Sequence, residues 1–243
     1  MEKELFELRE KAKSGDSAAQ YSLAVTYLEG NSIQKDFVEG CKWLESSAKS
    51  GNVSAQALLA DQYSKGEGVS KNYEAALSWY NKATKNGHPD SMYKMGLLMI
   101  YAKRDEKSVS KGEFLIRDAA NKGNINAQYE LGLLYLRGSD NFHLDGNESL
   151  RWLKASAEKG HILSINKLGY IYSVGTEDRK VKVNIEEAVK YWEIAANYGS
   201  IESQYNLAML YLDKSIKLWE TSAKKGFNKS KYMLNLLKGA TNK

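Results

Sequence analysis

The sequence predicts an all-α fold, a right-handed α/α superhelical solenoid of about six repeats with a half-repeat at each end. Three observations predict it. Glycines recur every 36 to 39 residues through most of the chain, a tyrosine-rich column recurs with the same period, and each period divides into two amphipathic segments with helical spacing. A single repeat of this kind cannot bury both of its faces, so the repeats must stack to form a continuous core.

The glycine column marks the end of each repeat, because a residue in the left-handed conformation commonly stops a helix. It consists of Gly15, Gly51, Gly87, Gly123, Gly160, Gly199 and Gly226. The second column consists of Tyr27, Tyr63, Met99, Tyr135, Tyr172 and Tyr211. These landmarks predict a single repeat domain over 1–243, with a capping helix at 1–15, six helix-turn-helix repeats at 16–226 and a second capping helix at 227–243.

The first helix of each repeat carries a column of small residues, which predicts a close approach of the second helix. The column holds Ala24, Ala60, Gly96, Gly132, Gly169 and Ala208. Glycine inside a helix costs about 1 kcal/mol relative to alanine, so tight packing is expected to offset that cost.

The second helix of each repeat begins at a preferred N-cap residue, fifteen positions before the closing glycine. The predicted caps are Asp36, Asn72, Ser108, Asp145 and Asn184. Glu39, Glu148 and Glu187 follow three positions later, which predicts capping boxes in three repeats.

The connections between the two helices vary along the chain. The third repeat lacks the glycine-containing loop of the second, the fourth has an altered loop from Ser139 to Gly146, and the fifth has a longer loop from Thr176 to Val183. The sixth repeat loses about nine residues, so Tyr211 is followed almost directly by Ser215. We expect a tight turn at that sixth connection.

The second repeat shows almost the full pattern, in Ala55, Leu59, Ala60, Tyr63, Gly66, Gly68, Val69, Asn72, Ala76, Trp79, Tyr80, Ala83 and Gly87. This pattern resembles the Sel-one-like repeat, a variant of the tetratricopeptide-type α/α solenoid, and the resemblance extends from about Leu5 to Leu237. It implies a non-catalytic scaffold that binds other proteins. In related solenoids the first helices of the repeats line the concave face.

The resemblance places a protein-binding groove on those first helices. Its expected residues are Tyr21, Val25, Asp61, Ser64, Tyr93, Lys94, Leu97, Tyr129, Leu133, Leu136, Asn166, Tyr170, Tyr205 and Met209. Tyrosine is a favoured interface anchor because it combines a large area with few rotatable bonds. The alternative is that each Tyr or Leu only packs between neighbouring repeats. The residues that depart from the repeat pattern, Asp61, Ser64, Asn166, Tyr170 and Lys94, are therefore the stronger candidates for specificity.

Composition and residue types exclude most other chemistry. The chain has 42% hydrophobic and 27% charged residues, which is typical of a folded protein. Its three histidines and single Cys41 show no ligand spacing, so we expect no metal and no cofactor. Cys41 is expected to be a packed thiol, and Trp43, Trp79, Trp152, Trp192 and Trp219 to be core residues. No nucleophile with a base is recognisable, so we expect no catalytic residues and no enzyme.

Charge and hydropathy predict the surroundings of the chain. No apolar run approaches the roughly 20 residues of a membrane span, so we expect no membrane insertion. The N-terminal segment lacks a signal-peptide pattern, so we expect a cytoplasmic protein. The possibility of a signal removed before Met1 stays open. The net charge is +5, and residues 200–243 alone, with eight basic and three acidic residues, sum to +5. That segment contains no Arg, the favoured base-reading residue, so nucleic-acid binding is not expected.

These observations leave several functions open. The first is an adaptor in a bacterial cell that binds a peptide, helix or toxin domain of another protein. A sharper alternative is an immunity or antitoxin protein that neutralises a cognate effector toxin in a one-to-one complex. A hydrolase and assembly through the solenoid ends are the less favoured alternatives. The polar closing helix argues against stacking of ends, so a monomer is expected when no partner is bound.

Overall fold

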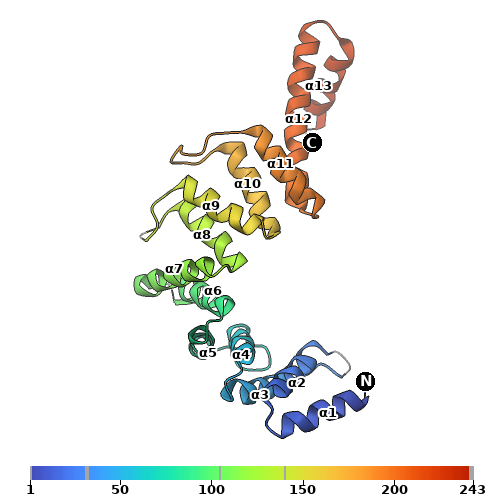
Figure 1. Ribbon diagram of the computed structural model, residues 1–243. Coiled ribbons are helices and arrows are strands. Elements are labelled where there is room, and N and C mark those ends of the chain that lie inside the picture. Colours follow the sequence, from blue (N-terminus) through green and yellow to red (C-terminus); the bar gives the residue numbers. More distant parts are fainter. Residues whose placement is uncertain (1, 31–32, 104, 140, 241–243) are drawn as a thin grey trace. The chain divides into compact units, whose positions relative to one another are not determined.

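Every regular element among the residues described by the computed structural model, 2–30, 33–103, 105–139 and 141–240, is a helix (Figure 1). The helices are α1 (Glu2–Lys13), α2 (Ser17–Glu29), α3 (Phe37–Lys49), α4 (Val53–Lys65), α5 (Tyr73–Lys85), α6 (Pro89–Leu98), the π-helix η1 (Met99–Lys103), α7 (Glu106–Asn121), α8 (Ile125–Arg137), α9 (Gly146–Ala157), α10 (Ile162–Val174), α11 (Ile185–Asn197), α12 (Ile201–Lys224) and α13 (Asn228–Ala240). The all-α solenoid fold predicted from the periodicity is confirmed.

The helices form two compact units, Met1–Leu144 and Asp145–Lys243. In the first unit, α2 packs against α3, α4 against α5 and α6 against α7; in the second unit, α10 packs against α11. Each of these pairs is a helical hairpin, and each second helix also packs against the first helix of the next pair within the unit. The single domain expected over 1–243 stays a prediction.

The close approach predicted from the small-residue column is confirmed at Ala24, Ala60, Gly96 and Gly169, and it is wrong at Ala208, which is exposed. Ala24 and Ala60 have no exposed surface. A Cβ added to Gly96 would lie 2.7 Å from the carbonyl oxygen of Gly112, and one added to Gly169 would lie 2.5 Å from the Trp192 ring. Because no side chain fits at these two contacts, the hairpins pack backbone against backbone, or backbone against ring.

The closing glycines adopt positive φ angles, from 80° at Gly87 to 96° at Gly15, as the helix-stop prediction requires. Four of the predicted N-caps are confirmed, because their side chains accept hydrogen bonds from backbone N–H groups in the first turn of the helix. They are Asp36 of α3, Asn72 of α5, Asp145 of α9 and Asn184 of α11.

Ser108 is a wrong prediction. The cap of α7 is Asp105, which accepts a hydrogen bond from the Ser108 backbone N–H at 2.9 Å. The physical reason is the missing loop: the third repeat continues from α6 into η1, and α7 begins one turn earlier than the second helices of other repeats.

The three predicted capping boxes form in part. The cap side chains accept the backbone N–H of Glu39, Glu148 and Glu187 at 2.9–3.1 Å. The glutamate carboxylates form ion pairs with the basic residue three positions later, at 2.6–2.9 Å.

The loop inside a repeat docks on the second helix of the preceding repeat. In the second repeat, a Cβ at Gly68 would lie 2.1 Å from the Phe37 carbonyl oxygen, and the Cys41 thiol donates a hydrogen bond to the Glu67 carbonyl at 3.3 Å. In the fourth repeat, the Asn141 amide donates to Ser110 of α7 at 3.1 Å. These contacts join neighbouring hairpins by chemistry that differs from loop to loop.

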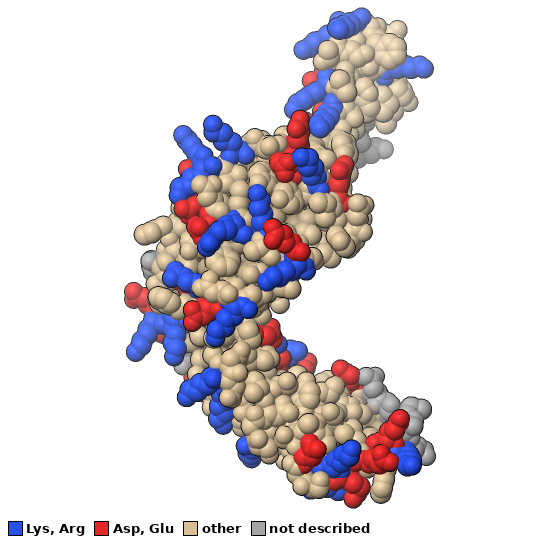
Figure 2. Space-filling model, in the orientation of Figure 1, with Lys and Arg blue, Asp and Glu red and all other residues tan. Residues whose placement is uncertain are grey.

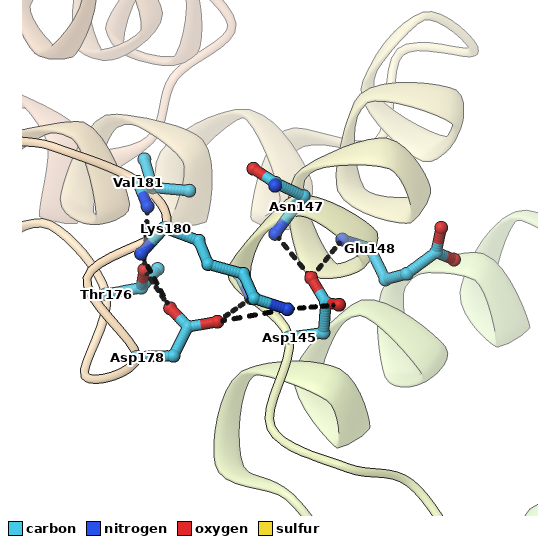
Figure 3. A network of polar contacts seen from close by, with 8 residues as sticks. Asp145, Asn147, Glu148, Thr176, Asp178, Lys180 and Val181 are labelled. Atoms are coloured by element: carbon cyan, nitrogen blue, oxygen red, sulfur yellow. Dashed lines mark hydrogen bonds and ion pairs between the residues drawn. The ribbon is translucent and has the colours of Figure 1, made fainter.

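The longer fifth loop docks through a carboxylate (Figure 3). Asp178 accepts hydrogen bonds from the Gly146 backbone N–H at the start of α9 (2.8 Å) and from the Thr176 hydroxyl (2.6 Å). Lys180 of the same loop forms an ion pair with the α9 cap Asp145 at 2.6 Å. Hydrogen bonds to the charged form outweigh the effect of burial and hold the pKa of Asp178 below its usual value.

The tight turn expected in the sixth repeat is wrong. Residues 201–224 form one uninterrupted 24-residue helix, α12, and α13 then packs against it (Figure 1). The first half of this repeat ends at Asp213 and the second half follows directly at Lys214, so the connection has no glycine and no loop. Because no loop reverses the chain, helical hydrogen bonding continues through the position where other repeats reverse direction.

Candidate protein-binding site

The expected groove residues lie on the first helices of the repeats, α2, α4, α6 and α8 in the first unit and α10 and α12 in the second. In the first unit all of them are half-buried: Tyr21, Val25, Asp61, Ser64, Tyr93, Lys94, Leu97, Tyr129, Leu133 and Leu136. Tyr21 packs against the core cluster around Ala24 and Leu59, so its ring serves packing at least in part. Each unit contributes its own surface.

One pocket in the first unit brings several of these residues together. It has a volume of about 510 Å³ and is bordered by α4, α5, α6 and η1. Its lining contains the predicted Asp61, Ser64, Lys94 and Leu97, together with Lys65, Tyr73, Tyr80, Leu98, Tyr101 and Ala102. A cavity of this size accommodates a few side chains of a bound segment.

The polar part of the pocket is an Asp–Tyr–Lys cluster. Asp61 accepts a hydrogen bond from the Tyr80 hydroxyl at 2.5 Å and from the Lys94 ammonium at 2.9 Å. Lys94 forms a second ion pair with Asp90, one helical turn earlier in α6, also at 2.9 Å. The three elements α4, α5 and α6 therefore meet at one carboxylate.

Burial and charge set the protonation of this cluster. Burial, followed by the hydrogen bond and charge of Asp61, raises the pKa of Tyr80 above its usual value. Burial acts to lower the pKa of Lys94, but its hydrogen bonds to Asp90 and Asp61 outweigh that effect and the pKa is raised. Near neutral pH the pocket thus presents a neutral phenol and a charged ammonium. Neither group is prepared to act as a base.

An aromatic surface continues from this pocket towards α8. Tyr101 of η1 and Tyr129 of α8 lie within electrostatic reach of Tyr93, whose pKa is raised by burial first and then by Glu130. Burial also raises the pKa of Glu130. The polar cluster therefore has tyrosine rings beside it, which suits a partner that offers both polar and apolar groups.

Tyr80, Tyr73 and Tyr101 line this pocket and Asp90 pairs with Lys94, although none of the four was predicted as a site residue from the sequence. Tyr80 was assigned to the repeat pattern because its column is otherwise filled by large apolar residues, and the structure shows it 3% exposed. The signal that could have found it is the chemistry of that column, where Leu44, Ile116, Leu153 and Trp192 carry no hydroxyl. A phenol there needs a partner, and Asp61 supplies it.

In the second unit the predicted residues separate. Asn166 is only 7% exposed, and its carboxamide oxygen accepts a hydrogen bond from the Ser203 hydroxyl at 2.8 Å. The expectation that Asn166 lies on an exposed strip is therefore wrong: the side chain joins α10 to α12. Tyr170, Tyr205 and Met209 are exposed, by 49%, 62% and 47%.

The groups considered for other chemistry have structural roles. Cys41 is 3% exposed, and burial raises the pKa of its thiol to about 11. His88 and His161 are N-caps of α6 and α10. Among the residues that the structure describes, no group of three His, Cys, Asp or Glu side chains could hold a metal ion.

The predicted core tryptophans are buried in part. Trp192 is 5% exposed, and Trp43, Trp79, Trp152 and Trp219 are half-buried. A search of the described residues for a helix long and apolar enough to cross a bilayer finds none.

Comparison with known proteins assigns the repeats. Sel1 repeats match residues 17–52, 53–88, 89–124, 125–161, 162–200 and 201–213. The chain belongs to the Sel1 repeat family. Proteins of this family generally mediate protein–protein interactions and are typically non-catalytic scaffolds.

Three similar proteins illustrate the family. A component of an ERAD-associated E3 ubiquitin-protein ligase, HRD3B of Arabidopsis thaliana, is 34% identical over 95 residues, which cover 38% of this chain and 14% of the plant protein. The solved structure of c5321, a protective antigen of uropathogenic Escherichia coli with the same repeat fold, is 29% identical with a TM-score of 0.78, over 96% of this chain and 51% of that one. The immunity protein Pa5087 of Pseudomonas aeruginosa, at 22% identity and a TM-score of 0.53, covers 77% of this chain and 67% of its own.

Proposed function

We propose that the chain is a non-catalytic scaffold that binds a partner protein through the first-helix surface of the first unit, with the Asp61–Tyr80–Lys94 cluster as its polar anchor. The observation that carries the proposal is that polar groups from three different helices converge in one pocket on the carboxylate of Asp61. Repeat packing needs neither this carboxylate nor the Tyr80 hydroxyl, since the same two columns hold residues without a charge in other repeats, and mostly apolar ones.

The chemistry of the pocket indicates how a partner segment would be held. The side chains of Asp61 and Lys94 are 17% and 35% exposed, so each can offer an oxygen or an N–H group to a ligand while keeping its present partner. Leu97 and Tyr101 provide apolar walls beside them. A loop or helix end that combines one polar side chain with an aromatic or aliphatic neighbour fits this arrangement.

The experiment begins with affinity capture from the source cells, followed by calorimetry with the purified partner. Asp61→Asn keeps the shape of the side chain and removes its charge, so we expect about tenfold weaker binding, in line with the loss of one charged hydrogen bond. The matched control is Asp118→Asn, at an exposed position of α7 outside the pocket. Equal affinities of wild type, Asp61→Asn and Asp118→Asn would overturn the proposed site.

A second candidate is an immunity protein that occupies the active surface of an effector toxin. Its support is the fold shared with immunity proteins of Pseudomonas aeruginosa. Such a protein should capture one partner in a one-to-one complex and suppress that partner's activity in a toxin assay. Several substoichiometric partners would instead favour a general adaptor. Cytoplasmic residence, predicted from the sequence, suits either role.

A further inference from the structure

The sixth repeat leaves exposed a first-helix column that the closed hairpins of α2/α3 and α4/α5 bury at Ala24 and Ala60. In the closed hairpin of α4 and α5, Leu59 is 1% exposed and Ala60 fully buried. The equivalent residues of α12 are Leu207, which is half-buried, and Ala208, which is exposed. Ser203 is the one fully buried residue of α12, and it lies on the side that bonds to α10.

The face runs along α12 without a charged residue, and it is most exposed over the first half of the helix, whereas Ser215, Trp219 and Ser222 of the second half are half-buried. With alternating spacings of four and three residues it contains Ile201, Tyr205, Ala208, Leu212, Ser215, Trp219 and Ser222. Ile201 is 80% exposed, Tyr205 62% and Leu212 37%. A heptad spacing of this kind forms one continuous stripe on a helix and is the pattern by which helices pair in solution.

The other repeats show what covers this face. A second helix folds back antiparallel on the first, and the closest contact joins two fixed columns, as between Gly96 of α6 and Gly112 of α7. In the sixth repeat these columns hold Ala208 and Ser215. On one straight helix they are seven residues, or about 10.5 Å, apart on the same face. The chain therefore retains both complementary surfaces but cannot bring them together within one copy.

We propose that two copies of this chain pair through α12, antiparallel, with Ala208 of each copy facing Ser215 of the other. The first half of α12 in each copy then packs against the second half of α12 in the other copy. The two copies form two such intermolecular hairpins, which replace the hairpin that each chain lacks. Such an interface is self-complementary and closes as a two-fold dimer.

The neighbouring helix and the charges agree with this arrangement. In a closed repeat the second helix packs on its own first helix and also on the first helix of the next repeat. α13 takes the place of that next first helix and packs on α12. The face with which the second half of α12 would contact its own first helix is therefore left open. Basic side chains prevail on the visible surface of α12 and α13 (Figure 2), whereas the stripe itself contains no charged residue that pairing would have to bury.

This proposal reverses the monomer expected from the polar closing helix, and the mass of the full chain in solution tests it. We expect light scattering across a concentration series to give twice the 27.3 kDa chain mass at the upper end. Ala208→Glu should weaken pairing about 100-fold, because each dimer would bury the new carboxylate twice. Thr221→Glu adds the same charge at an exposed position outside the stripe and should leave pairing intact. A monomer at all concentrations would overturn the proposal. It would do so even if a helix of another protein were then found to bind the stripe.

Cysteine cross-linking tests the register independently. In the double variant Ala208→Cys/Ser215→Cys, mild oxidation should give a disulfide-linked dimer, because each pair of facing columns comes from two copies. Within one straight helix the two sulfurs are too far apart to bond. A disulfide-linked monomer would show that the hairpin closes within one chain, and no disulfide at all would exclude the register; either result overturns the proposal. The wild type, whose Cys41 is buried, is the control for background oxidation.

Discussion

The closed hairpin of α4 and α5 and the open helix α12 share a glutamine, a leucine, an alanine and a tyrosine at equivalent positions of their first halves, but they differ in the connection between their two halves. In the closed case, Gln56 donates a hydrogen bond to the Ala48 carbonyl at 3.1 Å and is 5% exposed. In the open case, the equivalent Gln204 is exposed and its bond to Ala196 measures 3.5 Å. In this pair the loss of the connecting residues, which include Gly66 and Gly68 in the second repeat, accompanies the loss of the chain reversal.

The largest expected effect comes from placing one charge at the same column of both regions. Ala60→Glu should lower the free energy of unfolding by about 4 kcal/mol, because the carboxylate enters a fully buried contact. Ala208→Glu should change it by less than about 0.5 kcal/mol, because the position is exposed. Denaturant unfolding in dilute solution, where pairing of copies does not contribute, measures both. Equal losses would contradict the contrast between the closed and open regions.

An intermediate effect should follow from giving the open repeat a loop. Inserting the nine residues of 66–74 between Asp213 and Lys214 restores the length and glycines of the second repeat. The two halves of α12 should then fold back on each other, and burial of two or three apolar side chains should raise the unfolding free energy by about 3 kcal/mol. The variant should also stay monomeric in light scattering. A variant that remains one long helix by NMR would show that the second half lacks the information to form a hairpin.

The smallest effect concerns the docked loops that only closed repeats possess. The folded-state pKa of Asp178 is lowered, so its stabilising contribution is present above the unfolded-state pKa of about 4 and is lost as pH falls through the folded value. Asp178→Asn should therefore destabilise the protein by about 1 kcal/mol at pH 7, and by less at pH 3. Thermal unfolding at both pH values measures the difference. A loss that does not depend on pH would show that the charge is not what holds the loop on α9.

Sequence periodicity predicted the parts of the fold that depend on local rules. The glycine column, the small-residue column and the caps Asp36 and Asn72 act within one or two helical turns, so one sequence shows them. The error at Ser108 came from extrapolating a column across a repeat whose loop is replaced by η1. The error at the sixth connection came from assuming a turn where no turn-forming residue exists.

The candidate site was predictable where a polar residue replaces an apolar one on an accessible helix face. Asp61 and Lys94 were found in this way, and the structure joins them directly. Tyr80 was missed because an aromatic ring fits a core column, and only its hydroxyl shows a second role. Asn166 was misplaced because exposure depends on the neighbouring helix, whose Ser203 covers it.

The unbroken α12 also has a consequence for how such a chain can evolve. The repeats 17–52, 53–88 and 89–124 have equal lengths, so duplication of one such block in the gene would insert a further hairpin with matching faces on both sides. The sixth repeat is not a block of this kind, because its two halves form the single helix α12 and the chain does not reverse direction between them. Duplication of one of the equal-length blocks before residue 125 would thus add a closed hairpin, whereas duplication of the residues of α12 would add another unreversed helix.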